Sequence, residues 1–207
     1  NVFTVDNAPP TITAVTTYDT DLNGTVDKAT VVFSEPVDDS DFEADDFTID
    51  GQAGAAIATG TADDNTFDVT FTTVVGTGVK SLIHTADGGA DTATPGNALA
   101  TVTVVATDAA KPVFLSAQTK TTTTIAATFS ENLDGTTVNG SGNEFTVAGF
   151  AVSAASETAD GVVTLTVATM PTDATPNVTF TNIDNFKDLA GNQAVTPTTR
   201  TATDGTV

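Results

Sequence analysis

The sequence predicts an all-β protein built from two tandem β-sandwich domains. Three observations predict it: threonine, valine and phenylalanine recur in short alternating runs, turn residues separate these runs, and one pattern of about a hundred residues occurs twice. No segment sustains the 3.6-residue apolar period of an amphipathic helix. Short strands with turn signals roughly every 8–12 residues are typical of a sandwich.

Apolar and polar residues alternate in three runs, as expected for strands that turn one face to the core. The apolar positions of these runs are Phe67, Val69 and Phe71, then Ile125, Ala127 and Phe129, then Val163, Leu165 and Val167. Asp160-Gly161 precedes the third run and is typical of a tight hairpin turn. We therefore expect the apolar side chains of all three runs to be buried.

The repeated pattern consists of three motifs that keep their order along the chain. Residues 31–35 (VVFSE) recur as 127–131 (ATFSE), residues 47–51 (FTIDG) recur as 145–149 (FTVAG), and residues 91–97 (DTATPGN) recur in shorter form as 188–192 (DLAGN). An acidic residue followed shortly by proline marks each junction, at Asp6 and at Asp108. We place the domains at residues 1–108 and 109–207. The chain begins with neither an initiator methionine nor a signal peptide, so we interpret it as a piece of a longer protein.

The composition is strongly acidic. The chain has 27 acidic and 6 basic residues, and residues 1–108 alone hold 18 of the acids against two lysines. Nucleic acid and anionic membrane surfaces are bound by clustered lysine and arginine, so both partners are excluded. No apolar run approaches the ~20 residues that span a bilayer, and the absence of cysteine excludes disulfides and thiolate sites. Divalent cations or a saline habitat would each offset the repulsion among so many carboxylates.

The densest set of potential metal ligands lies in residues 19–27, which read D-x-D-x-N-G-x-x-D. Calcium takes six to eight oxygen ligands at about 2.3–2.6 Å, and alternate residues of a tight loop can point inward together. The candidate ligands are the side chains of Asp19, Asp21, Asn23 and Asp27 and the backbone carbonyl of Thr25. The pattern is the first half of an EF-hand-type loop, with Thr30 where the glutamate of position 12 should stand. The alternative is a solvated acidic turn.

We expect this loop to join strands at about residues 11–17 and 28–34, at one end of the first sandwich. In the second repeat the same connection shortens to about residues 118–122 and has no carboxylate. The loop is therefore predicted to be an insertion that serves the first domain.

The repeated motifs resemble those of the tandem immunoglobulin-like domains of large bacterial surface proteins. The residues that carry the resemblance are Phe-Ser-Glu at 33–35 and 129–131, the strand motif at 47–51 and 145–149, and Asp-Leu-Ala-Gly-Asn at 188–192. Such domains occur in adhesins, in S-layer proteins and as accessory modules of secreted enzymes. The resemblance implies immunoglobulin-like Greek-key sandwiches at the cell surface. It also implies that neighbouring domains of the same chain are partners and that copies assemble into a surface layer.

A second resemblance, to the calcium-binding linkers of cadherins, rests on residues 6–9 (DNAP). It implies that carboxylates from a linker and from a domain share one cation. Two such sets are expected, one for each domain: Glu35, Asp91 and Asp108, and Glu131, Asp188 and Asp204. The alternative is that these residues are ordinary surface acids.

Other candidate groups point away from catalysis. Residues 38–46 hold six acids, and we interpret them as a solvated loop that Phe42 and Phe47 fix to the core. His84 is the only histidine and is expected at the surface or partly buried. No serine lies in a G-x-S-x-G motif and no glycine-rich phosphate loop follows a strand, so we do not expect an enzyme.

The sequence therefore predicts a structural, calcium-stabilised segment of a secreted cell-surface protein of the S-layer or adhesin type. The alternative is a carbohydrate- or protein-binding accessory module of a secreted enzyme or adhesin. For that alternative, Tyr18 beside the acidic loop is the candidate aromatic platform.

Overall fold

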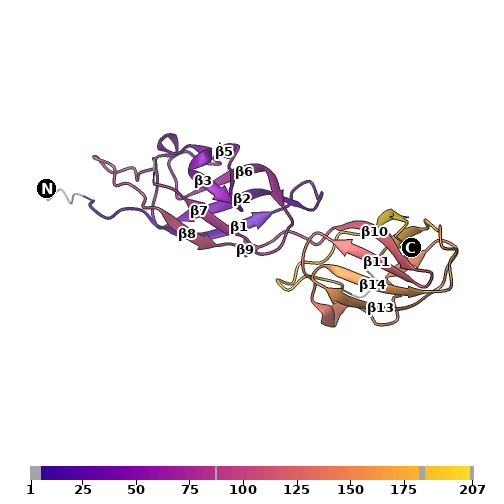
Figure 1. Ribbon diagram of the computed structural model, residues 1–207. Helices are drawn as coiled ribbons and strands as arrows, with labels where there is room; N and C mark the ends of the chain where they lie inside the picture. Colours follow the sequence, from indigo (N-terminus) through magenta and orange to yellow (C-terminus); the bar gives the residue numbers. More distant parts are fainter. Residues whose placement is uncertain (1–5, 87, 182–184, 206–207) are drawn as a thin grey trace. The chain divides into compact units, whose positions relative to one another are not determined.

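The computed structural model describes residues 6–86, 88–181 and 185–205, and in these residues the regular structure is β-strand with three short 3₁₀ turns (Figure 1). Within these ranges, no helix has the length and apolar character needed to cross a membrane. The chain divides into two compact units, and the main division falls between Ala109 and Ala110. Each unit is an immunoglobulin-like Greek-key β-sandwich, which confirms the predicted fold class.

The first unit packs two sheets, with strand orders β5-β6-β2-β1-β9 and β4-β3-β7-β8. Its strands are β1 (Ile12–Tyr18), β2 (Thr25–Phe33), β3 (Phe47–Ile49), β4 (Gln52–Ala53), β5 (Ala56–Ala58), β6 (Thr66–Val75), β7 (Ser81–His84), β8 (Val102–Val105) and β9 (Thr107–Asp108), with 3₁₀ turns η1 (Asp39–Asp41) and η2 (Ala44–Asp46). On β6, Phe67, Val69 and Phe71 are all buried, as their alternation predicted. A turn at Asp50-Gly51, with φ of 52° and 76°, closes the β3–β4 hairpin.

The second unit is one curled sheet with strand order β12-β15-β16-β10-β11-β14-β13. Its strands are β10 (Phe114–Thr121), β11 (Thr124–Phe129), β12 (Phe145–Val147), β13 (Val152–Ala159), β14 (Val162–Val167), β15 (Asn177–Phe180) and β16 (Thr198–Thr203), with 3₁₀ turn η3 (Gly135–Thr137). Asp160-Gly161 joins β13 to β14 with Gly161 at φ +68°, so the predicted hairpin is confirmed.

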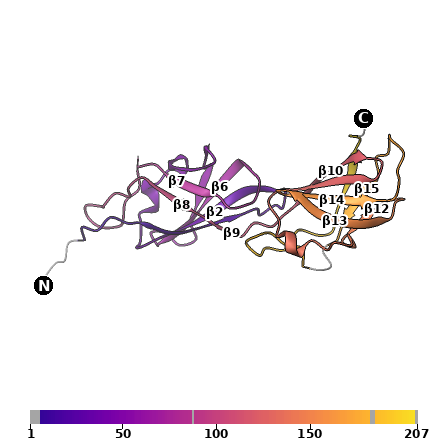
Figure 2. The same cartoon turned by 60° about the horizontal axis from the view of Figure 1, so that its bottom comes forward.

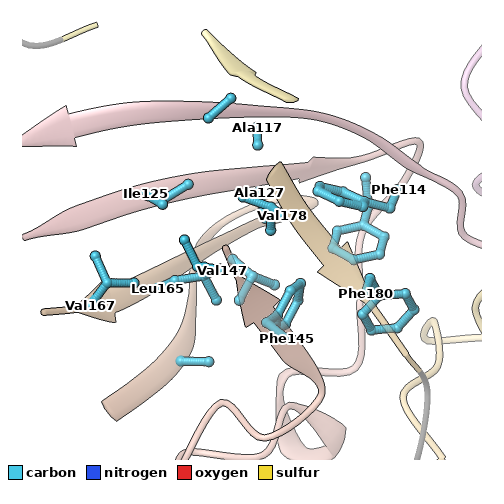
Figure 3. Packing of buried hydrophobic residues seen from close by; sticks show 14 of the residues in the cluster. Phe114, Ala117, Ile125, Ala127, Phe145, Val147, Leu165, Val167, Val178 and Phe180 are labelled. Atoms are coloured by element: carbon cyan, nitrogen blue, oxygen red, sulfur yellow. The ribbon is translucent and has the colours of Figure 1, made fainter. Parts of the chain in front are cut away.

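The core of the second unit is built around phenylalanine, and Figure 3 shows how its side chains meet between the two halves of the sheet. Phe180 lies 5.2 Å from Phe145 and 5.3 Å from Phe129, measured between ring centroids. The predicted inward residues of β11 and β14 are buried around these rings: Ile125, Ala127, Phe129, Val163, Leu165 and Val167. Aromatic rings at such separations add to the free energy of burial, so this cluster holds the sandwich together.

Each sandwich has two ends, and the strand register decides which loops share an end. In the first unit β1 and β2 are antiparallel, with Ile12 beside Phe33 at one end and Tyr18 beside Lys28 at the other. The loop of residues 19–24 is therefore at the opposite end from Glu35, which follows β2. In the second unit β10 and β11 leave only residues 122–123 between them, because threonine continues the strands beyond the predicted limits.

Candidate metal sites

The acidic loop between β1 and β2 brings three of its predicted ligands together. One carboxylate oxygen from each of Asp19, Asp21 and Asp27 lies within 4.8 Å of the other two. Asp19 is buried, Asp21 is exposed and Asp27 is half-buried, so the group opens to solvent on one side. The spacing suits carboxylates that share one hard cation.

Hydrogen bonds to Asp27 close this loop. The backbone amide of Thr20 donates to both carboxylate oxygens of Asp27 at 3.0 Å, and the Thr20 hydroxyl donates to Oδ2 at 2.5 Å. The amide of Asp21 donates to the same Oδ2 at 3.3 Å. Gly24 has φ +91°, a conformation that glycine adopts without strain, so the bend expected at position 6 of the motif is present.

The rest of the loop departs from an EF-hand. Strand β2 runs from Thr25 to Phe33, so the chain stays extended where the second helix of an EF-hand would follow the loop. Thr30 therefore lies within β2, and its hydroxyl donates to Asp68 Oδ1 on β6 at 2.5 Å. The side chain at position 12 is thus engaged with β6 and not with the loop. Asn23 is an exposed residue of the loop, and ligation by Asn23 and by Thr25 stays a prediction.

A second carboxylate group lies at the other end of the first unit. It contains Glu35 and Asp91, as predicted, and its third member is Asp6. One oxygen from each of the three lies within 4.8 Å of the others.

The prediction that Asp108 joins Glu35 and Asp91 is wrong. Asp108 ends β9 and pairs with Thr17 near the end of β1, whereas Glu35 lies beyond Phe33, which is beside Ile12. The length of β1, about 20 Å at ~3.3 Å per residue, separates Asp108 from the group. Asp6, which precedes β1, lies at the same end of the first unit as Glu35. Asp108, which ends the last strand, lies at the opposite end. The spacing from acid to proline at Asp6, which recurs at Asp108, is the sequence feature that indicates which acid lies beside the glutamate of each unit.

Asp91 is held in a turn that fixes its carboxylate. Its Oδ1 accepts hydrogen bonds from the amides of Ala93 at 3.0 Å and Asn97 at 2.9 Å, and its Oδ2 accepts one from the Asn97 side chain at 2.8 Å. These bonds, led by those from Asn97, hold the pKa of Asp91 below its usual value. Asn97 also donates to the backbone carbonyl of Asp6 at 3.2 Å, which ties the entering chain to this turn.

The pKa of Glu35 is shifted in the opposite direction. Loss of hydration raises the pKa of Glu35, and the negative charges of Asp6 and Asp91 raise it further. The three carboxylates therefore repel one another when all are ionised, and a bound cation would remove that repulsion.

The second unit repeats this turn. Carboxylate oxygens of Glu131 and Asp188 lie within 4.8 Å of each other. Asp188 Oδ1 accepts hydrogen bonds from the amides of Gly191 at 2.6 Å and Asn192 at 2.8 Å, and Oδ2 accepts one from the Asn192 side chain at 2.9 Å. The backbone pairing is also repeated, since Leu133 pairs with Asp188 as Val37 pairs with Asp91.

Asp204 does not belong to this group. It follows β16, whose Thr203 pairs with Gln118 near the end of β10, and the Thr119 hydroxyl donates to Asp204 Oδ1 at 3.4 Å. Glu131 lies beyond Phe129, which pairs with Phe114 at the start of β10. Asp204 is thus at the far end of the second unit, and its predicted grouping with Glu131 and Asp188 is wrong for the same reason as that of Asp108. In the sequence repeat, the counterpart of Asp6 is Asp108.

Two further expectations concern the first unit. The acidic segment 38–46 forms turns η1 and η2, in which Asp38 caps the first and Glu43 and Asp46 form a capping box in the second. Phe42 and Phe47 are buried beneath it, which confirms their predicted anchoring role.

The prediction that His84 lies at the surface or is partly buried is wrong. His84 is fully buried, and its ring centroid lies 5.0 Å from that of Phe47. Its position on β7 faces the core, a placement that the short run of residues 81–84 did not reveal.

No protein-family model and no curated protein matches this sequence. Among solved structures, the chain is similar to the N-terminal part of the bacterial S-layer protein SbsC, at 16% identity and a TM-score of 0.38, over 95% of this chain and 45% of that one. A longer SbsC structure gives 16% identity and a TM-score of 0.40, over 93% of this chain and 32% of that one. The Escherichia coli adhesin FdeC gives 12% and 0.29, over 96% and 66%. The chain thus spans less than half of either SbsC structure, and similarity at this level assigns neither a family nor a function.

Proposed function

We propose that this chain is a non-catalytic structural segment of a secreted bacterial cell-surface protein, of S-layer or adhesin type, and that calcium stabilises it. The observation that carries the proposal is the convergence of carboxylates at both ends of the first unit, Asp19, Asp21 and Asp27 at one end and Asp6, Glu35 and Asp91 at the other. These acids lie at the ends of a rigid sandwich, where a bound ion would hold the loop and the entering chain in fixed positions. Such a segment maintains spacing between neighbouring domains.

The charge balance supports a cation. The first unit has two lysines for its many acids, and these lysines form ion pairs with Asp68 and Asp50, outside both carboxylate groups. Calcium prefers oxygen ligands in flexible arrangements, and extracellular modules bind it at about 10⁻⁴–10⁻³ M. At about tenfold excess over its Kd, one calcium ion would add about 1.4 kcal/mol to the free energy of unfolding.

Calorimetry of the whole chain tests the calcium role. Thermal unfolding is compared in millimolar calcium, in magnesium and in excess chelator, at matched ionic strength so that charge screening is constant. We expect calcium alone to raise the midpoint of the first unit. If all three traces coincide, calcium does not stabilise the chain and a saline habitat explains the acidity.

Three variants locate the effect. Asp21→Asn removes a ligand of the loop and Glu35→Gln removes one of the second group, and each is expected to reduce the calcium-dependent shift. Glu35→Gln should also raise the midpoint in chelator, because it removes the charge that Asp6 and Asp91 repel. Asp45→Asn is the matched control, since Asp45 is an exposed acid of the same unit outside both groups. If Asp45→Asn reduced the calcium-dependent shift by as much as the other two variants, net charge and not ligation would determine that shift.

The carbohydrate-binding alternative is less well supported. A sugar platform needs an open aromatic face, but the Nζ atom of Lys28 lies 4.6 Å from the centre of the Tyr18 ring and covers one face of it. Binding on a glycan array that is lost in Tyr18→Ala would favour the alternative.

A further inference from the structure

His84 lies at the base of the connection between β7 and β8, two strands that lie side by side (Figure 2). Its ring is fully buried, and the ring centroid lies 6.1 Å from that of Phe42, on the segment between η1 and η2. Nδ1 lies 3.2 Å from the carbonyl oxygen of Ala100, so the imidazole with its proton on Nδ1 donates a hydrogen bond there. His84 thus links the beginning of the connection to its end.

The connection itself has little apolar surface to hold it on the sandwich. Residues 88–101 read GGADTATPGNALAT, and Leu99 is the one large aliphatic or aromatic residue among them. Backbone hydrogen bonds hold it as well, since the amide of Gly89 donates to the carbonyl of Asp41 at 2.8 Å and that of Leu99 donates to the carbonyl of Gly89 at 2.9 Å. Segments with few buried apolar contacts open at a lower free energy than the core around them.

The second unit holds the corresponding connection with a phenylalanine. The amide of Ala194 donates to the carbonyl of Phe186 at 3.0 Å, as Leu99 donates to Gly89, so Phe186 corresponds to Gly89. Phe186 is fully buried, and its ring centroid lies 4.9 Å from that of Phe180. The connection of the second unit is therefore anchored by one phenylalanine packed on another.

The first unit has neither member of this pair. His84 takes the place of Phe180, since Phe47 pairs with His84 as Phe145 pairs with Phe180. Gly89 takes the place of the anchor, and Phe42 fills the space beside it, because a Cβ atom on Gly89 would lie 2.2 Å from Cε1 of Phe42. The β7–β8 connection thus rests on a side chain that can take up a proton.

We infer that His84 is a pH-sensitive switch: when its imidazole binds a second proton, residues 88–101 are released from the sandwich while the other strands of the first unit stay paired. Protonation makes Nε2 a hydrogen-bond donor, and among the described residues buried Nε2 has no hydrogen-bond partner. It also places a positive charge in a fully buried site. Release of the connection removes Ala100 from the ring and lets water reach it.

The surroundings of the ring offer one compensating charge. The neighbouring strands β3 and β8 contain no charged residue, and the carboxylate of Asp46 on η2 is the charged group that acts on His84 in the described part of the chain. Burial lowers the pKa of His84, and the Ala100 carbonyl and Asp46 only partly oppose this. The buried form therefore binds the proton at lower pH than a released form with the ordinary pKa of about 6.5.

The sign of the pH effect follows from this difference. Because the released form binds the proton more readily, the equilibrium constant for release rises as the pH falls below 6.5, by up to about tenfold between pH 7.5 and pH 5.5. Asp91 lies within the connection, so release also separates it from Asp6 and Glu35. The inference goes beyond the proposed calcium role, and it is tested in excess chelator so that neither result depends on the other.

Hydrogen exchange of the whole chain, measured for single amides by NMR at pH 7.5 and pH 5.5, tests the inference. After correction for the intrinsic pH dependence of exchange, we expect protection of the Gly89 and Leu99 amides to fall by up to about tenfold. The amides of β2 and the amide of Ala194 in the second unit should keep their protection. An equal fall at Leu99 and in β2 would mean that the whole unit opens. That result overturns the inference, as does unchanged protection at Leu99.

Two variants assign the effect to His84. His84→Phe introduces the residue that the second unit has and should fold normally, and His84→Gln keeps a polar side chain that does not titrate. In both variants the protection of the Leu99 amide should be the same at pH 7.5 and pH 5.5. A fall that persists in both would assign the pH effect to carboxylates such as Asp46 or Glu35 and would overturn the switch. The calcium-dependent shift in melting temperature at pH 7.5 should be equal in His84→Phe and the wild type, so failure of the calcium proposal is seen separately.

Discussion

The two units share a sandwich fold and a phenylalanine core, but they differ at corresponding positions. His84 on β7 corresponds to Phe180 on β15, and both side chains are fully buried. The β1–β2 connection has residues 19–24, whereas the β10–β11 connection has residues 122–123. Since both sequences form the same sandwich, the longer loop and the buried histidine are not requirements of the fold. They are features of the first unit alone. Each can be removed by replacing its residues with those at the corresponding positions of the second unit.

Replacing a core phenylalanine should have the largest effect on the free energy of unfolding, because the phenylalanine core is the feature that both units share. Phe33 on β2 corresponds to Phe129 on β11, and both are buried against other phenylalanine rings. Replacing either by alanine should lower the free energy of unfolding of its own unit by about 3–5 kcal/mol. Calorimetry should show one shifted transition in each variant. If Phe33→Ala and Phe129→Ala both shift a single transition by the same amount, the units unfold as one cooperative body and cannot be compared separately.

The core could be predicted because alternation along a strand is a strong signal. Phe67, Val69 and Phe71 are each separated by one polar residue, and a half-buried strand is the structure that buries all three. His84 gave no such signal, because β7 is only four residues long and pairing with β3, not local sequence, determines which face it turns to the core.

The candidate sites were predicted in part, and the reason is again register. Local spacing brought Asp19, Asp21 and Asp27 together correctly, since all three lie in one loop. Glu35 and Asp91 were also grouped correctly, because both belong to motifs that the second unit repeats. Asp108 was assigned to the wrong end, since the end that a residue occupies depends on the parallel pairing of β9 with β1, which the sequence does not show.

Replacing His84 by phenylalanine should have the next largest effect. Nδ1 of His84 lies 3.2 Å from the carbonyl oxygen of Ala100, while in the described part of the chain the buried Nε2 has no hydrogen-bond partner. Burial lowers the pKa of His84, although the Ala100 carbonyl and the Asp46 carboxylate partly oppose this. His84→Phe should therefore raise the free energy of unfolding of the first unit at neutral pH by about 1 kcal/mol.

The pH dependence gives a sharper test of the same variant. When the pH falls below the ordinary histidine pKa of about 6.5, the unfolded chain binds a proton that folded His84 binds only at lower pH. The first unit should therefore lose stability as the pH falls from 6.5 towards the lowered pKa. His84→Phe should remove this loss, and the second unit, which has no histidine, should not show it. Equal slopes for wild type and variant, measured by urea unfolding between pH 7 and pH 5, would contradict the assignment.

The smallest expected effect is that of the ion pair on the outer face of β2 and β6. Lys28 Nζ lies 3.0 Å from Asp68 Oδ2, and the two side chains are 30% and 31% exposed. The strand register aligns these residues with Thr124 and Thr164 of the second unit, so the sandwich forms without the pair. An ion pair in contact with water is worth about 0.2–1 kcal/mol, because solvent and salt screen it and ordering two side chains costs entropy. Lys28→Thr, Asp68→Thr and the double variant form a cycle whose coupling energy should fall in that range and shrink as salt is added. A coupling energy of several kcal/mol that salt does not reduce would mean that β2 and β6 depend on a charge pair that β11 and β14 do not have. The two units would then differ in the interactions that stabilise their shared strands, and not only in the loop and the histidine of the first unit.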